Sequence, residues 1–149
     1  MASEHEIYRR YLDAVGLHGQ AAAAAAGLHP TEWHALSALD LSGRLTSGEL
    51  AAACGLTTSA TTRLVDRLER AGRVRRVADP ADRRRVLIEG VPTDVADIVG
   101  PARELVGEVF ARYTPEQLET LFDYFTRAAP AYRAATAEIR ERRSVGGAG

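Results

Sequence analysis

Nine arginines fall between residues 57 and 90, and they are the chain's densest cluster of groups that could bind a charged partner. The same segment holds five acidic residues, so its net charge is +4, whereas residues 1–56 carry −3 and residues 91–149 carry −2. All 19 basic residues are arginine, which a GC-rich genome explains in part, so only their clustering counts as evidence. A basic field between two acidic segments is typical of a protein that binds a polyanion. The alternative is a solvated charged face.

Short hydroxyl side chains stand at two expected helix starts beside this basic segment. Thr46 and Ser47 open one helix, and Thr57 and Thr58 open the next. The free backbone N–H groups of a helix N-terminus favour a phosphate, while the hydroxyl oxygens can also cap the helix. We therefore expect these residues to cap the helices, to contact phosphate, or to do both.

Two short helices joined by a glycine turn would position these hydroxyls. Thr46-Ser47-Gly48-Glu49 has the pattern of a capping box, and the helix that it starts ends at Gly55. The second helix starts at Thr57-Thr58-Ser59, continues to Ala71 and ends at Gly72, with an apolar stripe of Thr61, Leu64, Val65 and Leu68. Two such helices form a helix-turn-helix.

The residue pattern after Gly72 changes from helical to extended. Val74 and Val77 alternate with arginines, residues 78–82 form a turn cluster, and residues 86–88 favour a strand. The segment therefore predicts a β-hairpin whose tip carries Arg83, Arg84 and Arg85. Three adjacent arginines repel one another unless anions or acidic groups offset them.

Long amphipathic helices flank this core on both sides. We expect helices over about residues 4–26, from Pro30, over about 93–113 and from Thr114 to about 140. Pro101 would kink the third of these or mark its true start. The predicted fold is mainly α with a small β-hairpin wing, in a single domain over residues 1–149, with its core at about 30–90 and a disordered tail at 144–149.

Enzyme chemistry is disfavoured, because the chain has no Ser-His-Asp order, phosphate-binding glycine loop or metal-protease motif. We expect no catalytic residue and no cofactor. The one cysteine, Cys54, excludes a disulfide within the chain, and we expect it to be a small buried residue. The first residues lack the pattern of a signal peptide, so we expect a cytoplasmic protein with no membrane partner.

The order of elements resembles that of the multiple-antibiotic-resistance regulator (MarR) family. Residues 45–51 resemble the family's entry to the first helix of the helix-turn-helix, and residues 58–72 resemble its recognition helix. Residues 79–84 resemble its wing tip, with Asp82 and Arg84 on the family's Asp-x-Arg motif. The chain departs from the family at residues 90–93, which read Gly-Val-Pro-Thr where a Leu-Thr pair usually caps the next helix.

The resemblance implies roles for the basic residues on double-stranded DNA. Ser59, Thr62 and Arg63 lie at the end of the recognition helix that usually reaches base edges in the major groove. Arg67 would contact phosphate or pair with Asp66 and Glu69. The wing arginines are candidates to contact the DNA backbone or minor groove, with Arg84 inserted into the groove and Asp82 orienting the wing. The full set of expected DNA contacts is Thr46, Ser47, Thr57, Thr58, Ser59, Thr62, Arg63, Arg67, Arg83, Arg84 and Arg85.

The resemblance also implies a transcriptional regulator that works as a homodimer. The helices at about 4–26 and 94–142 would form the dimer interface; the alternative is that they cover their own subunit. A repressor on a pseudo-palindromic operator is the leading hypothesis, released by a small aromatic or phenolic effector near Tyr11, Trp33 and His34. For Trp33 itself, a role as a core anchor is favoured over one in the pocket.

Three alternatives stay open. The chain could be a metal-responsive or redox-responsive regulator, or a winged-helix module for protein contacts or non-specific DNA binding. The histidines lack a tight metal-ligand spacing, and redox sensors of the family carry their cysteine in the first helix, where this chain has none. We therefore expect no metal ligand.

Overall fold

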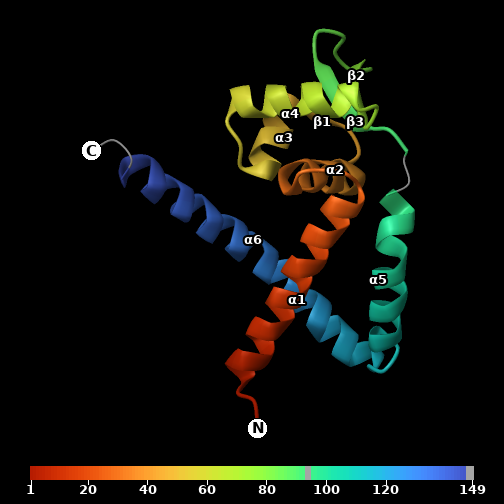
Figure 1. The fold of residues 1–149 in the computed structure, drawn as a ribbon, viewed down its shortest axis with the longest axis vertical. Coiled ribbons are helices and arrows are strands. Elements are labelled where there is room, and N and C mark those ends of the chain that lie inside the picture. The colour runs from red at the N-terminus through yellow and green to blue at the C-terminus, as the bar shows by residue number, and fades with distance from the viewer. Residues whose placement is uncertain (93–94, 147–149) are drawn as a thin grey trace. The chain divides into compact units, whose positions relative to one another are not determined.

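The computed structural model describes residues 1–92 and 95–146 and confirms a mainly α fold with a small sheet (Figure 1). The chain divides into two compact units, Met1–Gly100 and Pro101–Gly149. No helix in the described part of the chain has the length and apolar character needed to cross a lipid bilayer. The elements in chain order are α1 (Glu4–Ala25), α2 (Pro30–Ser42), β1 (Leu45–Thr46), α3 (Ser47–Cys54), α4 (Thr58–Arg70), β2 (Val74–Ala78), β3 (Val86–Gly90), α5 (Val95–Phe110) and α6 (Pro115–Gly146).

The helix-turn-helix forms where the sequence predicts it. Thr46 caps α3 in a capping box with Glu49, and Thr57 caps α4 by accepting from the backbone N–H of Ala60 at 3.3 Å. Gly55 adopts a left-handed conformation with φ of 60°, which lets the chain leave α3 and turn into α4. These two caps and this turn fix where α4 begins, and hence which residues lie at its N-terminal end.

The sheet has one strand more than the predicted hairpin. The strand order is β1-β3-β2, with antiparallel pairing throughout. Leu45 pairs with Ile88 across β1 and β3, and Arg75 pairs with Glu89 across β2 and β3. β1 has only two residues, too few to show the alternation of a strand in sequence, and its pairing depends on β3 some forty residues later.

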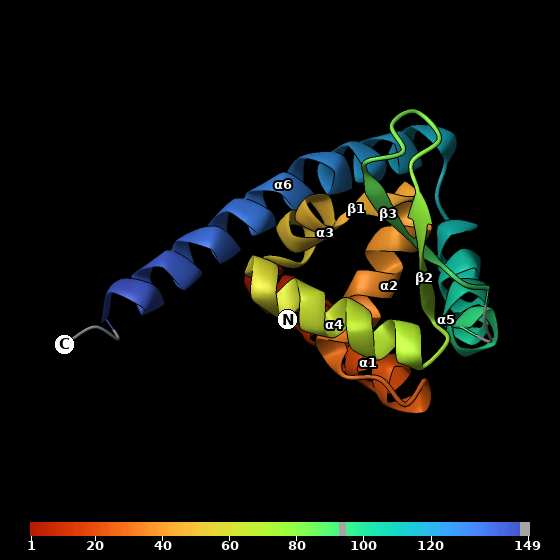
Figure 2. The same cartoon turned by 90° about the horizontal axis from the view of Figure 1, so that it is seen from above.

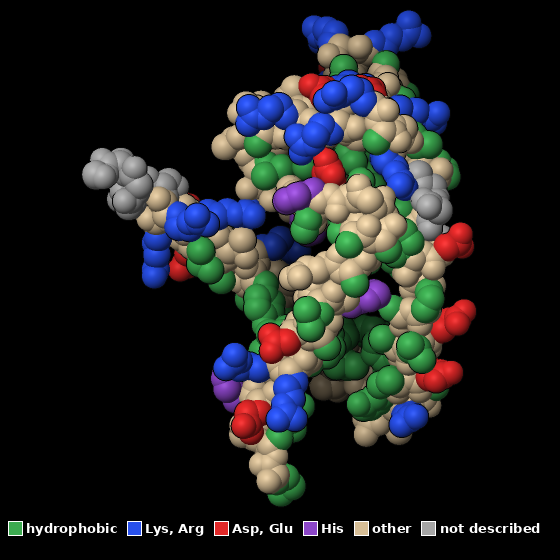
Figure 3. All heavy atoms as spheres, viewed as in Figure 1, with side chains coloured by type: hydrophobic (Ala, Val, Ile, Leu, Met, Phe, Trp, Pro, Cys, Tyr) green, Lys and Arg blue, Asp and Glu red, His purple; other side chains and the backbone are tan. Residues whose placement is uncertain are grey.

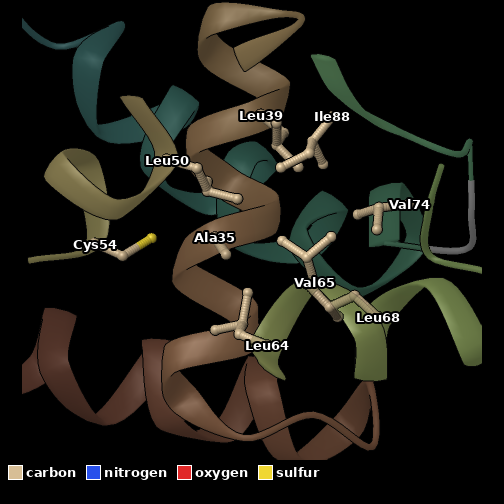
Figure 4. Packing of buried hydrophobic residues seen from close by; sticks show 9 residues of the cluster. All are labelled: Ala35, Leu39, Leu50, Cys54, Leu64, Val65, Leu68, Val74 and Ile88. Carbon is tan, nitrogen blue, oxygen red and sulfur yellow. The ribbon is translucent and has the colours of Figure 1, made fainter. Parts of the chain in front are cut away.

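The core of the first unit lies between α2, α3, α4 and the sheet (Figures 2 and 4). Its cluster contains Ala35, Leu39, Leu50, Cys54, Leu64, Val65, Leu68, Val74 and Ile88. The predicted buried stripe of α4 and the burial of Cys54 are therefore confirmed. Trp33 is only partly buried and is not a member of the cluster, so the expectation that it anchors the core is wrong.

The terminal helices differ in detail from the prediction. α5 continues through Pro101 and the predicted start at Thr93 lies outside the described residues. α6 begins with the expected cap, in which the backbone N–H of Gln117 donates to Thr114 Oγ1 at 3.3 Å. It extends to Gly146, so residues 144–146 of the tail expected to be disordered are helical.

The two-unit division differs from the single domain that we expected. The boundary falls inside α5 at Pro101, whose ring removes a backbone donor from the helix. Within unit Pro101–Gly149, none of the side chains described between residues 101 and 143 is buried, although Phe110 and Phe122 have ring centroids 5.6 Å apart. A domain normally has its own buried core, so this unit is not a complete domain by itself.

Candidate nucleic-acid interface

The N-terminal half of α4 presents polar side chains on the face opposite its core contacts. Ser59, Thr62 and Arg63 are exposed, whereas Thr61 and Leu64 are buried. This separation follows from the helical period of 3.6 residues, which places residues 61, 64, 65 and 68 on one side of the helix. The arrangement of a polar face on a helix that follows a tight turn is the one that places side chains in a major groove.

The threonine hydroxyls at the helix starts already have partners. Thr46 Oγ1 donates to Glu49 Oε2 at 2.8 Å and accepts from the Glu49 N–H at 3.2 Å. The backbone N–H of Thr46 donates to the same carboxylate, and these hydrogen bonds hold the pKa of Glu49 below its ordinary value. Thr62 Oγ1 donates to the carbonyl of Thr58, four residues earlier on α4, at 3.0 Å. Capping is therefore the observed role of the Thr46 and Thr57 hydroxyls.

Two arginines of the basic segment have no partner among the residues that the structure describes. Within residues 1–92 and 95–146, the structure records no hydrogen bond or ion pair for the side chains of Arg63 on α4 and Arg83 in the hairpin loop. Both are exposed. Their charge is therefore fully available to an anion.

Arg67 pairs with another residue of the protein, one that the sequence did not indicate as its partner. Its Nε donates to Glu32 Oε1 of α2 at 2.9 Å, so the expected pairing with Asp66 and Glu69 is wrong. Arg67 lowers the pKa of Glu32. The reason is that Arg67 projects from α4 toward α2, a contact between residues 35 positions apart that no local spacing predicts.

Asp66 and Glu69 pair instead with Arg76 of β2. Arg76 Nη2 lies 2.6 Å from Asp66 Oδ1, and its Nη1 contacts Glu69. The pKa of Arg76 is raised, chiefly by the hydrogen bond with Asp66. One arginine of the predicted basic field is thus neutralised by the acidic side of α4.

The hairpin loop is organised by two aspartates. Asp82 Oδ1 accepts from the backbone N–H of Arg84 at 3.0 Å, and Arg84 Nε lies 3.4 Å from the same oxygen. Asp79 Oδ1 accepts from the Ala81 N–H at 2.9 Å, and Asp79 Oδ2 lies 3.7 Å from Arg85 Nη1. The Arg84 side chain is nevertheless 93% exposed, so it projects from a turn whose backbone is held in place.

The base of the hairpin holds a carboxylate that sequence reasoning missed. Glu89 of β3 binds Arg75 of β2 and Arg44, whose Nε lies 2.5 Å from Glu89 Oε2. These hydrogen bonds, with Arg75 the stronger influence, hold the pKa of Glu89 below its ordinary value. The antiparallel register could have indicated the Arg75 pairing, whereas Arg44 directly precedes β1, whose Leu45 pairs with Ile88 of β3. Glu89 therefore ties the strands together and offsets one of the two positive charges beside it.

A further arginine links α1 to the winged region. Arg73 Nη2 donates to the carbonyl of Ala26 at 3.1 Å, just after the C-terminus of α1. A cation at this position satisfies a free carbonyl and interacts favourably with the helix dipole. This role too was not predicted from the sequence.

The positive charge that faces solvent is consequently carried by fewer residues than the number of arginines suggests. Figure 3 shows basic side chains over α4 and at the tip of the β2–β3 hairpin, with acidic side chains between them. Among the described side chains of that face, Arg63, Arg83 and Arg84 remain as the cations least neutralised by the protein. They lie in one compact unit, Met1–Gly100.

The three residues expected near an effector come from two helices, Tyr11 from α1 and the neighbours Trp33 and His34 from α2. Trp33 and His34 lie on α2, and His34 Nε2 is 3.3 Å from the carbonyl oxygen of Ala53. The buried residues of α1 are near its C-terminus, beginning at Ala22, whereas Tyr11 lies eleven residues earlier, about 16 Å along the axis. Tyr11 therefore lies well away from the buried end of α1.

No group of three or more His, Cys, Asp or Glu side chains capable of holding a metal ion occurs among the described residues. The histidines and Glu32 near the first two helices therefore form no cluster there. Cys54, the other candidate sensor residue, is 5% exposed and lies in the core cluster.

Comparisons with known proteins agree with this geometry. A sequence profile of the MarR family matches residues 26–85. The uncharacterized HTH-type transcriptional regulator YcgE of Bacillus subtilis strain 168 is 39% identical over 127 residues, covering 83% of this chain and 82% of the relative. The match is therefore longer than the helix-turn-helix and hairpin alone.

Solved structures share the fold. A MarR family protein from Bacillus stearothermophilus is 27% identical with a TM-score of 0.63, over 88% of this chain and 94% of that one. Bordetella bronchiseptica BpsR, whose DNA binding is regulated by 6-hydroxynicotinic acid, is 19% identical with a TM-score of 0.54, over 85% and 93% of the two chains. At that identity the second likeness shows the fold alone.

Proposed function

This chain belongs to the MarR family of DNA-binding transcriptional regulators, and from that premise we propose that it is a sequence-specific repressor that binds a pseudo-palindromic operator as a homodimer and is released by a small-molecule effector. The observation that carries the proposal is the pairing of two exposed cationic elements in one unit, Arg63 on α4 and Arg84 on the hairpin tip. Acting on DNA, the protein would work in the cytoplasm.

The two elements suit different parts of a duplex. Arg63 near the start of α4 has the length and donors to bind guanine O6 and N7 in the major groove, and the methyl group of the exposed Thr62 suits a thymine methyl. Arg84, held at its backbone by Asp82, suits the negative potential of a narrow minor groove. Base recognition would come from α4, while the hairpin tip would contribute affinity.

The terminal helices support a dimer of this chain. In a single subunit, large apolar side chains are exposed on α1, α5 and α6: Ile7, Tyr11, Val15, Leu17, Leu105, Val106, Val109, Phe122, Tyr124, Tyr132 and Ile139. A monomeric protein rarely exposes so much apolar surface, and a second copy of the chain offers the same helices for packing. A two-fold dimer would set the two α4 helices about one DNA turn apart, ~34 Å.

Release by an effector is the second part of the proposal. BpsR, which shares the fold, is regulated by 6-hydroxynicotinic acid. Tyr11, Trp33 and His34 carry aromatic and hydrogen-bonding groups suited to a small aromatic or phenolic anion, and a partner subunit would have to complete their site. Trp33 is the only tryptophan, so its fluorescence reports directly on this region. Titration with 6-hydroxynicotinate should quench that fluorescence and lower DNA affinity; no change in either would remove the effector from the proposal.

Sequence-specific binding is tested on DNA beside the protein's own gene. Affinity for that duplex is compared with affinity for random DNA of equal length at fixed salt. We expect at least about a thousandfold preference, and Arg63→Ala should reduce it by about ten- to a hundredfold, the value of one bidentate base contact. Equal affinity for both duplexes would defeat the proposal and favour a non-specific winged-helix module.

A further inference from the structure

Glu32 contacts the recognition helix α4 from outside it. Its Oε1 accepts from Arg67 Nε at 2.9 Å, and its Oε2 accepts from the backbone N–H of His29 at 3.0 Å. The Glu32 side chain is only 14% exposed to solvent. One carboxylate therefore closes the N-terminus of α2 and joins that helix to α4.

A second tie holds α4 from another element. Arg76 of β2 binds Asp66 through Nη2 at 2.6 Å, and its backbone N–H donates to Glu69 Oε1 at 3.2 Å. The C-terminal half of α4 is thus connected to both α2 and β2 by charged hydrogen bonds. Arg63, one helical turn before Arg67, extends from the half of α4 that carries neither tie.

These charged hydrogen bonds restrict the rotation of α4 about its axis more sharply than its buried apolar stripe does. Hydrophobic contacts are non-directional, so Leu64, Val65 and Leu68 hold α4 against the core without defining its rotation sharply. Charged hydrogen bonds depend on distance and angle, and therefore resist rotation of the helix. A small rotation of α4 would redirect Arg63, whose base contacts need alignment to a fraction of an ångström.

We propose that Glu32 is a positioning residue for DNA reading: by holding Arg67, it fixes the rotation of α4 and so the direction from which Arg63 meets the base edges. The proposal rests on the proposed sequence-specific function and names a determinant of it that does not touch DNA. It also reassigns Arg67 from a phosphate contact to a residue that acts within the protein.

A phosphate-contact role for Arg67 predicts the opposite sign for a change at Glu32. In that case Glu32 competes with DNA for Arg67, so neutralising Glu32 would free the arginine, remove a negative charge and strengthen binding to every duplex. In the positioning role, the same change loosens α4 and weakens binding to the correct site only. Glu32→Gln separates the two, since glutamine keeps an oxygen that accepts from the His29 N–H.

The experiment compares four full-length proteins: the wild type, Glu32→Gln, Arg67→Gln and the control Glu6→Gln. Glu6 is the matched control because it accepts from the Ser3 N–H at 2.7 Å at the start of α1, loses the same charge, and has no arginine partner among the described residues. Dissociation constants are measured over a range of salt for a site that the wild type selects from random duplexes and for a random duplex of equal length.

We expect Glu32→Gln and Arg67→Gln each to lower affinity for the selected site about three- to tenfold, with unchanged salt dependence and unchanged affinity for random DNA, since one charged hydrogen bond is lost. Glu6→Gln should bind as the wild type does. Unchanged or tighter binding of the selected site by Glu32→Gln would overturn the proposal. A smaller salt slope in Arg67→Gln would do the same. So would an equal loss of affinity for both duplexes, which is the sign of impaired folding. A wild type that selects no site overturns the proposed function first, and this inference with it.

Discussion

Arg75 and Glu89 face each other across the β2–β3 ladder, and their side chains form an ion pair that Arg44 completes from the segment before β1. This carboxylate joins the hairpin to the helix-turn-helix, two parts that must stay fixed relative to each other if α4 and the wing are to contact one duplex. Its partners make its ionised form the stable one, which gives the first prediction.

Glu89→Gln should lower the urea midpoint of unfolding at neutral pH, and the deficit should shrink in acid. The pKa of Glu89 in the folded protein lies below the ordinary value of 4.5 that holds in the unfolded chain. Its ionised form therefore stabilises the fold above about pH 4.5, and this stabilisation is lost as pH falls through the lowered folded pKa. Urea titrations at pH 7 and pH 3.5 measure the difference, with Glu119→Gln on α6 as a control. A deficit that grows in acid would contradict this assignment.

Arg84→Ala should weaken binding to all duplexes and flatten its salt dependence. Each phosphate neutralised by a protein cation contributes about 0.9 to the slope of log affinity against log salt, so the slope should fall by about 0.9 per subunit. The measurement is a salt titration of DNA binding, beside Arg9→Ala, which removes an exposed arginine from α1. An unchanged slope would show that Arg84 does not contact the backbone.

Asp82→Ala should reduce DNA affinity even though it removes a negative charge from the basic tip. Asp82 Oδ1 accepts from the backbone N–H of Arg84 at 3.0 Å, and without this hydrogen bond the turn no longer presents Arg84 in one direction. We expect a loss of about three- to tenfold. Asp82→Asn keeps an acceptor oxygen and should recover most of the affinity; tighter binding by Asp82→Ala would mean that charge outweighs orientation.

Val106→Glu should break the proposed dimer. Val106 is 49% exposed on α5 in a single subunit, and a carboxylate there would have to be desolvated in an apolar interface. We expect the dimer dissociation constant to rise by about a hundredfold or more, measured by analytical ultracentrifugation. Leu41→Glu is the control, because Leu41 is 84% exposed on α2, outside the terminal helices. Equal effects of both substitutions would argue against α5 as part of the interface.

Cys54→Ser should destabilise the protein by about 1–3 kcal/mol, because the change puts a hydroxyl among apolar side chains. Cys54 is 5% exposed and packs in the core cluster, so an oxidant in solution should reach it only when the fold opens. DNA binding by the folded wild type should therefore be unaffected by mild peroxide treatment. Loss of binding under oxidation that Cys54→Ser abolishes would restore the redox-sensor alternative.

The sequence by itself determined the local structure. The capping residues Thr46, Thr57 and Thr114, the turn at Gly55 and the spacing of residues 61, 64, 65 and 68 each act over a few positions, and each appears in the structure as predicted. The composition of residues 57–90 likewise located the basic segment, and the motif at residues 79–84 located the wing.

Only the tertiary structure decided which arginines face outward. Arg67, Arg75 and Arg76 belong to the same basic segment as Arg63 and Arg84, yet carboxylates on α2, β3 and α4 hold them within the protein. β1 and the Arg44–Glu89 pair were also beyond prediction, since both join residues more than forty positions apart. Local hydrogen bonds depend on neighbouring residue types, whereas an ion pair between distant elements depends on how the core brings those elements together.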